Sequence, residues 1–193
     1  MRFPRILIAA FALSLSLMPA SLLAQQSKDQ PAEPAADDPG PMHQRLGELA
    51  GTWEVAIQYK LGDKVHNGDA TCEAKLILDG RFLQQDYHSL FQGKPFHVMQ
   101  ILGFDNQKKK FVELMMDTMG TGILHNEGDI SADGKVITNE GESRDPTTKK
   151  PFKLRTVYTF ADHDHFTLEW YEVKDGDKAE KTVTLRHSRK KAG

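Results

Sequence analysis

Turn signals divide the chain after Thr52 into segments of similar length, and this spacing constrains the fold more than any other feature. Residue clusters with high turn preference, rich in glycine, aspartate, asparagine and proline, separate ten segments there. Turn residues at such intervals, with no helical run between them, are typical of antiparallel strands joined by hairpins. We therefore predict strands of about ten residues each. The nine clusters are Gly62-Asp63, Asp79-Gly80, Gly93-Lys94, Asp105-Asn106, Gly120-Thr121-Gly122, Asp133-Gly134, Asp145-Pro146, Asp162 to Asp164, and Asp175-Gly176.

The side chains within these segments alternate as they do in half-buried strands. Trp53, Val55, Ile57 and Tyr59 are separated by smaller or more polar neighbours. No segment has the pattern of a helical crossover, so we do not expect parallel pairing. Ten long antiparallel strands in sequence order are expected to close, because closure removes the exposed edges. The prediction is an all-β fold, a single antiparallel up-and-down β-barrel, with an open or two-sheet sandwich as the alternative.

The first 24 residues have the pattern of a secretory signal peptide. Arg2 and Arg5 precede an apolar run over 6–18, and Ala24 offers a cleavage point before Gln25. The run is about 13 residues, shorter than the roughly 20 that span a bilayer. An uncleaved anchor is the alternative. We expect a periplasmic or secreted protein with no integral membrane segment after cleavage.

Residues 25–41 are expected to form a disordered linker, because they hold four prolines and no aromatic or β-branched residue. Pro41 is suited to the first turn of a short helix. Met42, Leu46 and Leu49 then form one apolar stripe, and Gly51 ends it. The folded domain is expected over residues 42–190.

Composition excludes several classes of function. The net charge of −2 gives no concentrated basic surface, so we expect no nucleic acid partner. The single cysteine, Cys72, excludes an intrachain disulfide and a multi-thiolate zinc site. Asp162 to His165 could hold a metal, but aspartate is also favoured at turns for its own backbone hydrogen bonds. His88, His97 or His125 could bind a non-covalent haem. We expect neither a metal nor a cofactor, and the oligomeric state is left open.

The segment Gly51-Thr52-Trp53 after a short helix resembles the start of the lipocalin-type barrels. That resemblance, to a lipocalin/calycin-like fold, implies that the Trp53 indole closes one end of the barrel. It also implies that an arginine of the last strand stacks on the indole by a cation–π contact. Arg186 is the first candidate for this barrel-end packing, and Arg189 is the other.

A larger set of motifs resembles the bacterial domain of unknown function 1579 family over about residues 42–189. The resemblance implies a lipocalin-like barrel and no established activity. Thr118 stands where a serine is expected and Met115 where an aromatic residue is common, so Met115 is expected to reshape any shared pocket. The motifs are residues 78–83 (LDGRFL), 102–106 (LGFDN), 117–122 (DTMGTG), Gly141-Glu142, Asp145-Pro146 and 169–172 (EWYE).

Candidate site residues follow from the strand faces. On the expected strand over 111–119, Glu113 and Asp117 share one face, and the other face is more apolar. Simple burial would leave both carboxylates solvated. The alternative turns Asp117 inward, beside Met119, as a polar anchor in an apolar pocket. We hypothesise an internal ligand-binding cluster, with exposed ion pairs between strands as the open alternative. Its residues are Asp117, Met119, Glu142, Arg155, Glu169 and Tyr171.

These observations favour an exported, non-enzymatic protein that holds a small apolar or amphipathic molecule in a barrel cavity. A group of carboxylate, arginine and tyrosine side chains would fix the polar end of that molecule. Two alternatives stay open. One is a structural or interaction protein with a filled barrel, and the other is a hydrolase or isomerase that uses cavity carboxylates. The sequence has no Gly-x-Ser-x-Gly motif, which weighs against nucleophilic catalysis.

Overall fold

The computed structural model of the chain describes residues 38–144, 148, 150–173 and 178–191. The predicted signal peptide, most of the predicted linker, and the turn signals Asp145-Pro146 and Asp175-Gly176 lie outside these residues. No helix within them is long and apolar enough to cross a membrane.

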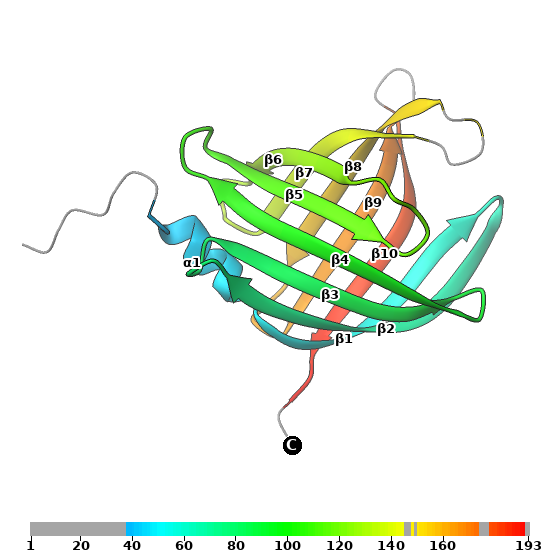
Figure 1. Ribbon diagram of the computed structural model, residues 1–193, viewed down its shortest axis with the longest axis horizontal. Helices are drawn as coiled ribbons and strands as arrows, with labels where there is room; N and C mark the ends of the chain where they lie inside the picture. The colour runs from blue at the N-terminus through cyan, green and yellow to red at the C-terminus, as the bar shows by residue number, and fades with distance from the viewer. Residues whose placement is uncertain (1–37, 145–147, 149, 174–177, 192–193) are drawn as a thin grey trace, which may run out of the picture. The chain divides into compact units, whose positions relative to one another are not determined.

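The described chain folds as one short helix followed by ten strands (Figure 1). The helix begins at Pro41, as predicted, and the strands take up nearly all the rest. Their bounds are α1 Pro41–Gly47, β1 Gly51–Leu61, β2 Lys64–Ile77, β3 Phe82–Phe91, β4 Lys94–Asp105, β5 Lys110–Asp117, β6 Leu124–Ile130, β7 Val136–Arg144, β8 Pro151–Phe160, β9 His165–Val173 and β10 Ala179–Arg189.

The ten strands form a closed antiparallel barrel in which each strand pairs with its neighbours in sequence. The last strand returns to the first, and Trp53 on β1 lies opposite Arg189 on β10. Closure leaves no strand edge exposed, which explains why long strands are tolerated here. The predicted up-and-down β-barrel is confirmed, and the sandwich alternative is wrong.

The turn residues account for the positions at which the chain reverses. Between β2 and β3 the backbone angle φ is positive at Leu78 (50°), Asp79 (55°) and Gly80 (83°). Glycine adopts this region without strain, and aspartate tolerates it better than most residues. Between β4 and β5, the Asp105 side chain accepts hydrogen bonds from the backbone N–H of Gln107 and of Lys108. The chain thus reverses at residues whose types favour turns, as the sequence predicted.

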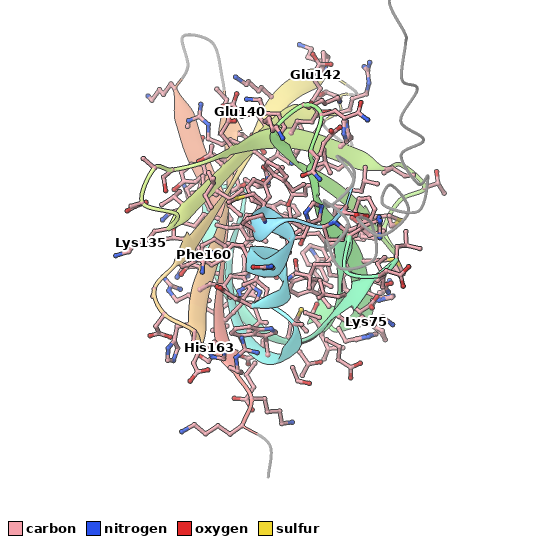
Figure 2. The ribbon with its side chains drawn as sticks, turned by 90° about the vertical axis from the view of Figure 1, so that its left-hand side faces the viewer. Lys75, Lys135, Glu140, Glu142, Phe160 and His163 are labelled. Atoms are coloured by element: carbon pink, nitrogen blue, oxygen red, sulfur yellow. The ribbon has the colours of Figure 1, made fainter. Side chains whose placement is uncertain are left out.

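One end of the barrel is closed by α1 and by the indole of Trp53; we call it the closed end. Leu46 and Leu49 are buried and belong to the same apolar core as Trp53. The Trp53 Nε1–H donates to the Leu49 carbonyl at 2.9 Å, and the indole packs edge-on against Phe166. Figure 2 views this end, with the helix in front of the strands. The predicted role of Trp53 at the barrel end fits this packing.

The arginine that stacks on Trp53 is Arg189, the second of the two candidates. Its guanidinium carbon lies 4.1 Å from the centre of the indole ring. The same side chain donates to the carbonyls of Ala50 and Glu48, each at 2.7 Å. Arg186 is exposed and lies opposite Ala56 on the outer face. The physical reason is strand parity, since Arg186 is three positions from Arg189 and therefore points to the opposite face.

Replacing Arg189 with alanine should lower the free energy of unfolding by about 2 kcal/mol, because the cation–π contact and two hydrogen bonds at the closed end are lost. Arg186→Ala is the matched control on the same strand and should change it by less than about 0.5 kcal/mol. Urea denaturation followed by fluorescence measures both values. Equal losses in the two variants would show that Arg189 does not stabilise this end.

Candidate functional site

Polar side chains are buried in the middle of the barrel, where an apolar core would be expected. Residues directly opposite in paired strands share a face. Glu113 lies opposite Leu102 on β4 and Asn126 on β6, both fully buried, so it points inward. Six consecutive strands each contribute one such residue, at most 1% exposed: Gln85, Gln100, Glu113, Asn126, Asn139 and Thr156. Tyr158, two residues after Thr156 on β8, lies on the same face and is also buried.

Glu113 is the centre of this group. Its Oε1 accepts hydrogen bonds from the Tyr158 hydroxyl at 2.7 Å and from Gln100 Nε2. Its Oε2 accepts from the Thr156 hydroxyl at 2.6 Å and from Asn126 Nδ2 at 2.9 Å. The amide of Asn139 lies farther, at 3.5 Å. All these groups donate, which is the pattern around a carboxylate, and charge-assisted bonds of this kind offset the cost of burying it. We call these six residues the Glu113 cluster.

The carboxylate also fixes the direction of the neighbouring amides. Asn126 and Asn139 turn their nitrogens toward Glu113, so their Oδ1 atoms point elsewhere. Gln85 likewise donates its nitrogen to the Tyr87 hydroxyl at 3.2 Å. The oxygens of these three amides have no hydrogen-bond partner in the protein. Buried acceptors in folded proteins normally receive a donor, so these three atoms point to a donor supplied from outside the chain.

Toward the end opposite α1, which we call the open end, the inward face becomes apolar. Ile57, Ala70, Val98, Trp170 and Leu185 pack against the core yet are only half-buried. These residues line the inward face toward the open end. Its rim carries aromatic contacts, with Tyr59 5.3 Å from His66 and 5.5 Å from Phe91 between ring centres.

A buried histidine lies between this interior and the closed end. The His187 ring stacks on Phe166 at 3.8 Å between centres, and its Nε2 lies 3.1 Å from the Tyr87 hydroxyl. Burial lowers the pKa of His187 to about 3, and the hydrogen bonds of Phe166 and Leu185 only partly oppose this. Burial also raises the pKa of the Cys72 thiol to about 12. Both groups are therefore uncharged near neutral pH, and the Cys72 side chain is fully buried.

The free energy of unfolding should fall as pH decreases from about 6.5 toward 3, because the unfolded chain protonates His187 and the folded chain does not. The expected slope from this one group is about 1.4 kcal/mol per pH unit. His187→Gln keeps a partner for Tyr87 but cannot titrate. Its free energy of unfolding should therefore fall less steeply with decreasing pH, by about 1.4 kcal/mol per pH unit. Urea denaturation at pH 7.5 and 5.0 measures the difference. Parallel pH profiles for the two proteins would contradict the burial of a neutral His187.

Of the six predicted ligand residues, Asp117 shares the inward face with Glu113. It lies opposite Val98 near the open end and is half-buried. Its Oδ1 accepts the Met119 backbone N–H at 2.8 Å, so it caps the turn that ends β5. Met119 has left the strand and is 66% exposed. The expected contact between these two residues thus exists through the backbone of Met119.

Glu142, Arg155, Glu169 and Tyr171 lie on the outer face, so the internal cluster expected from the sequence does not form. Arg155 alternates with the buried Leu154 and Thr156 and pairs with Glu140 at 2.7 Å. Tyr171 donates to Glu169 at 2.8 Å, and Lys181 lies 2.7 Å from the same carboxylate. These contacts match the alternative given by the sequence, in which exposed side chains form pairs between strands. A ligand-binding role for the four residues stays a prediction.

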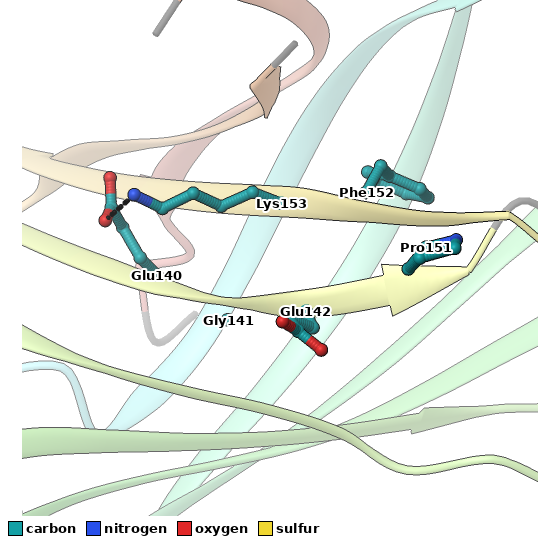
Figure 3. A pocket seen from close by; sticks show the side chains of 6 residues that line it. All are labelled: Glu140, Gly141, Glu142, Pro151, Phe152 and Lys153. Atoms are coloured by element: carbon teal, nitrogen blue, oxygen red, sulfur yellow. Dashed lines mark ion pairs between the residues drawn. The ribbon is translucent and has the colours of Figure 1, made fainter. Parts of the chain in front are cut away.

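The outer face carries an open pocket between β7 and β8 (Figure 3). Lys153 reaches across to Glu140, with its Nζ 2.5 Å from Oε2, whereas Glu142 points away from this pair. The hydrogen bond from Lys153 lowers the pKa of Glu140. For Glu169, partial burial pushes the pKa upward, but the hydrogen bonds from Lys181 and Tyr171 outweigh it and the pKa is lowered. Both carboxylates are thus held in ion pairs at neutral pH.

Sequence reasoning missed the Glu113 cluster, although a signal for it exists. Each of its amides lies on a strand face that is otherwise apolar, as Gln100 lies between Val98 and Leu102. A polar residue at the same depth on six adjacent strands indicates one shared layer. At Asp162 to His165, where the sequence allowed a metal site, two side chains contact each other at the turn. His165 Nδ1 lies 2.8 Å from Asp162 Oδ1. Within the described ranges, no three His, Cys, Asp or Glu side chains gather as a metal site would require.

Comparison with known proteins agrees with this architecture. The fold is similar to that in the crystal structure of Rv2717c from M. tuberculosis, with a TM-score of 0.60 and 18% identity, covering 80% of this chain and 100% of that chain. At this identity the likeness shows the fold alone. No curated protein matches the sequence. The family model described as a protein of unknown function, DUF1579, matches residues 38–189. The chain therefore belongs to the DUF1579 family, as its motifs predicted.

Proposed function

We propose that this protein binds a small amphipathic molecule inside its barrel and acts outside the cytoplasm, where the pattern of residues 1–24 would direct it. The observation that carries the proposal is the set of unpartnered amide oxygens beside the Glu113 cluster. Toward the open end, the inward face beside these atoms is an apolar wall of half-buried residues. Binding sites for small molecules commonly combine apolar walls with a few fixed polar groups.

The half-buried inner wall favours this function over a filled, purely structural barrel. In a filled barrel, inward residues such as Val98 and Trp170 would be covered by their neighbours, as Leu83 and Leu102 are. Both oxygens of Glu113 already accept protein donors. That arrangement suits a group that orients its neighbours better than one that transfers protons.

Titration with N-phenyl-1-naphthylamine, an uncharged dye that fluoresces in apolar surroundings, tests the proposal. The expected result is saturable binding of one dye per chain, with energy transfer from Trp170 because that indole lines the accessible wall. Replacing Trp170 with phenylalanine should remove most of the transfer while dye binding persists. Trp53, the other tryptophan, should account for the transfer that remains.

Two tryptophan substitutions on neighbouring strands decide whether the dye sits inside. Ala70 faces inward and is half-buried, whereas Ala56 faces outward and is exposed. Ala70→Trp should fill the accessible half and weaken dye binding at least about tenfold, and Ala56→Trp should leave it unchanged. Absence of dye binding to the wild-type protein, or equal binding to both variants, would overturn the proposed function.

A further inference from the structure

We propose that the molecule held in the barrel is an amphipathic amine, with an apolar body and a cationic head that donates hydrogen bonds. This inference rests on the proposed function and names the chemical class of its ligand. It follows from two independent features of the interior, namely the kind of polar atom left unpartnered and the sign of the charge on the inward face.

The unpartnered atoms near the Glu113 cluster are hydrogen-bond acceptors. They are the side-chain oxygens of Gln85, Asn126 and Asn139, on residues that are fully buried. The carboxylate fixes the orientation of Asn126 and Asn139, because their nitrogens donate to Glu113, and the Gln85 nitrogen contacts the Tyr87 hydroxyl. An ammonium group carries three donors and no acceptor. An ammonium group can therefore donate to oxygens of this kind, whereas a carboxylate head would present a further acceptor to them.

Between the two ends of the barrel, the charged side chains on the described part of the inward face are acidic. Register places Glu113, Asp117 and Glu172 on this face. Among the described strand residues, inward lysine and arginine side chains occur only at the ends, namely Arg189 at the closed end and Lys64 and Lys94 beside the hairpin turns of the open end. No cation thus lies at the depth of the amide oxygens, on the inward positions that the structure describes.

The buried histidine does not change this balance. His187 stacks on Phe166 and contacts the Tyr87 hydroxyl, and burial lowers its pKa to about 3. It is therefore neutral when a ligand would bind. Trp170 Nε1 is an unpartnered donor on the inner wall, and it suits a neutral acceptor farther along a ligand. An anionic head placed beside Glu113 would meet like charge and no counter-charge, which is costly in a buried site.

Displacement of the dye by three molecules with one alkyl chain tests the inference. Decylamine, decanol and decanoate, each kept below its micelle concentration at pH 7, differ only in the head group. Decylamine should displace the dye at roughly a tenfold lower concentration than decanol. Decanoate should be the weakest of the three. In the Glu113→Gln variant, the concentrations of decylamine and decanoate that displace the dye should differ less than in the wild-type protein, because the substitution removes a negative charge.

The outcomes separate the two proposals. If the wild-type protein binds the dye and decanoate displaces it as well as or better than decylamine, the amine inference is overturned and the proposed function stands. If the wild-type protein binds no dye, the proposed function itself is wrong. The head-group order in the wild-type protein decides the inference even if Glu113→Gln fails to fold.

Discussion

Glu113→Ala should lower the free energy of unfolding by about 3–5 kcal/mol, because it leaves several buried donors without an acceptor. The Tyr158 and Thr156 hydroxyls and the Asn126 amide would each lose their partner in a region with at most 1% exposure. Urea denaturation at pH 7.5 measures the loss. Because these donors come from two strands, β6 and β8, the variant should also unfold with lower cooperativity.

The matched control is Glu142→Ala, which removes an exposed carboxylate from the outer face of β7. Its expected effect is below about 0.5 kcal/mol, as for most exposed positions. A loss of less than about 1 kcal/mol for Glu113→Ala would contradict the account, because it would mean that the cluster does not depend on its central carboxylate.

Gly128→Ala should prevent folding or destabilise the barrel by more than about 3 kcal/mol, because the added methyl group meets backbone rather than movable side chains. A Cβ atom at this position would lie 1.8 Å from the Thr138 carbonyl oxygen and 2.5 Å from the Asn139 Cα. Two strands would have to separate beside Asn139, a member of the Glu113 cluster. Circular dichroism and the yield of monomeric protein measure the effect.

Gly68→Ala is the control, since a Cβ atom at Gly68 on β2 has nothing within 4 Å. Alanine in such a place should leave stability unchanged or raise it by about 0.4–1 kcal/mol, because the unfolded chain loses conformational freedom. Similar stabilities for the two alanine variants would show that β6 and β7 do not approach each other this closely.

Much of the fold could be predicted because it depends on local chemistry. Asp79-Gly80 adopts the positive φ angles that its residue types favour, and Trp53 begins a strand whose alternation is visible in the sequence. Once strands are joined only by short turns, antiparallel pairing follows, and closure follows from the cost of exposed edges. The short helix was predictable for the same reason, because Leu46 and Leu49 lie on one face.

The site could not be predicted in the same way, because its polar groups are stabilised by partners far apart in sequence. Simple burial alone would place Glu113 in solvent, since the opposite face of β5 is more apolar, and the sequence left the direction of that face open. The donors that make its burial possible include Tyr158, 45 residues away. On β8 the alternation of Phe152, Leu154, Tyr158 and Phe160 by itself places Arg155 on the outer face. On β10 parity separates Arg186 from Arg189, but only the pairing register shows that Arg189 lies opposite Trp53.

The side-chain amide signals in a two-dimensional ¹H–¹⁵N nuclear magnetic resonance spectrum test the central claim most directly. During titration with decylamine, the NH₂ signals of Asn126 and Asn139 should shift and saturate at one molecule per chain. Those of Gln58 and Asn67, which contact each other on the exposed surface at 3.4 Å, should stay unchanged. Shifts confined to the surface amides, or no saturable shift at Asn126 and Asn139, would contradict a ligand site at the Glu113 cluster.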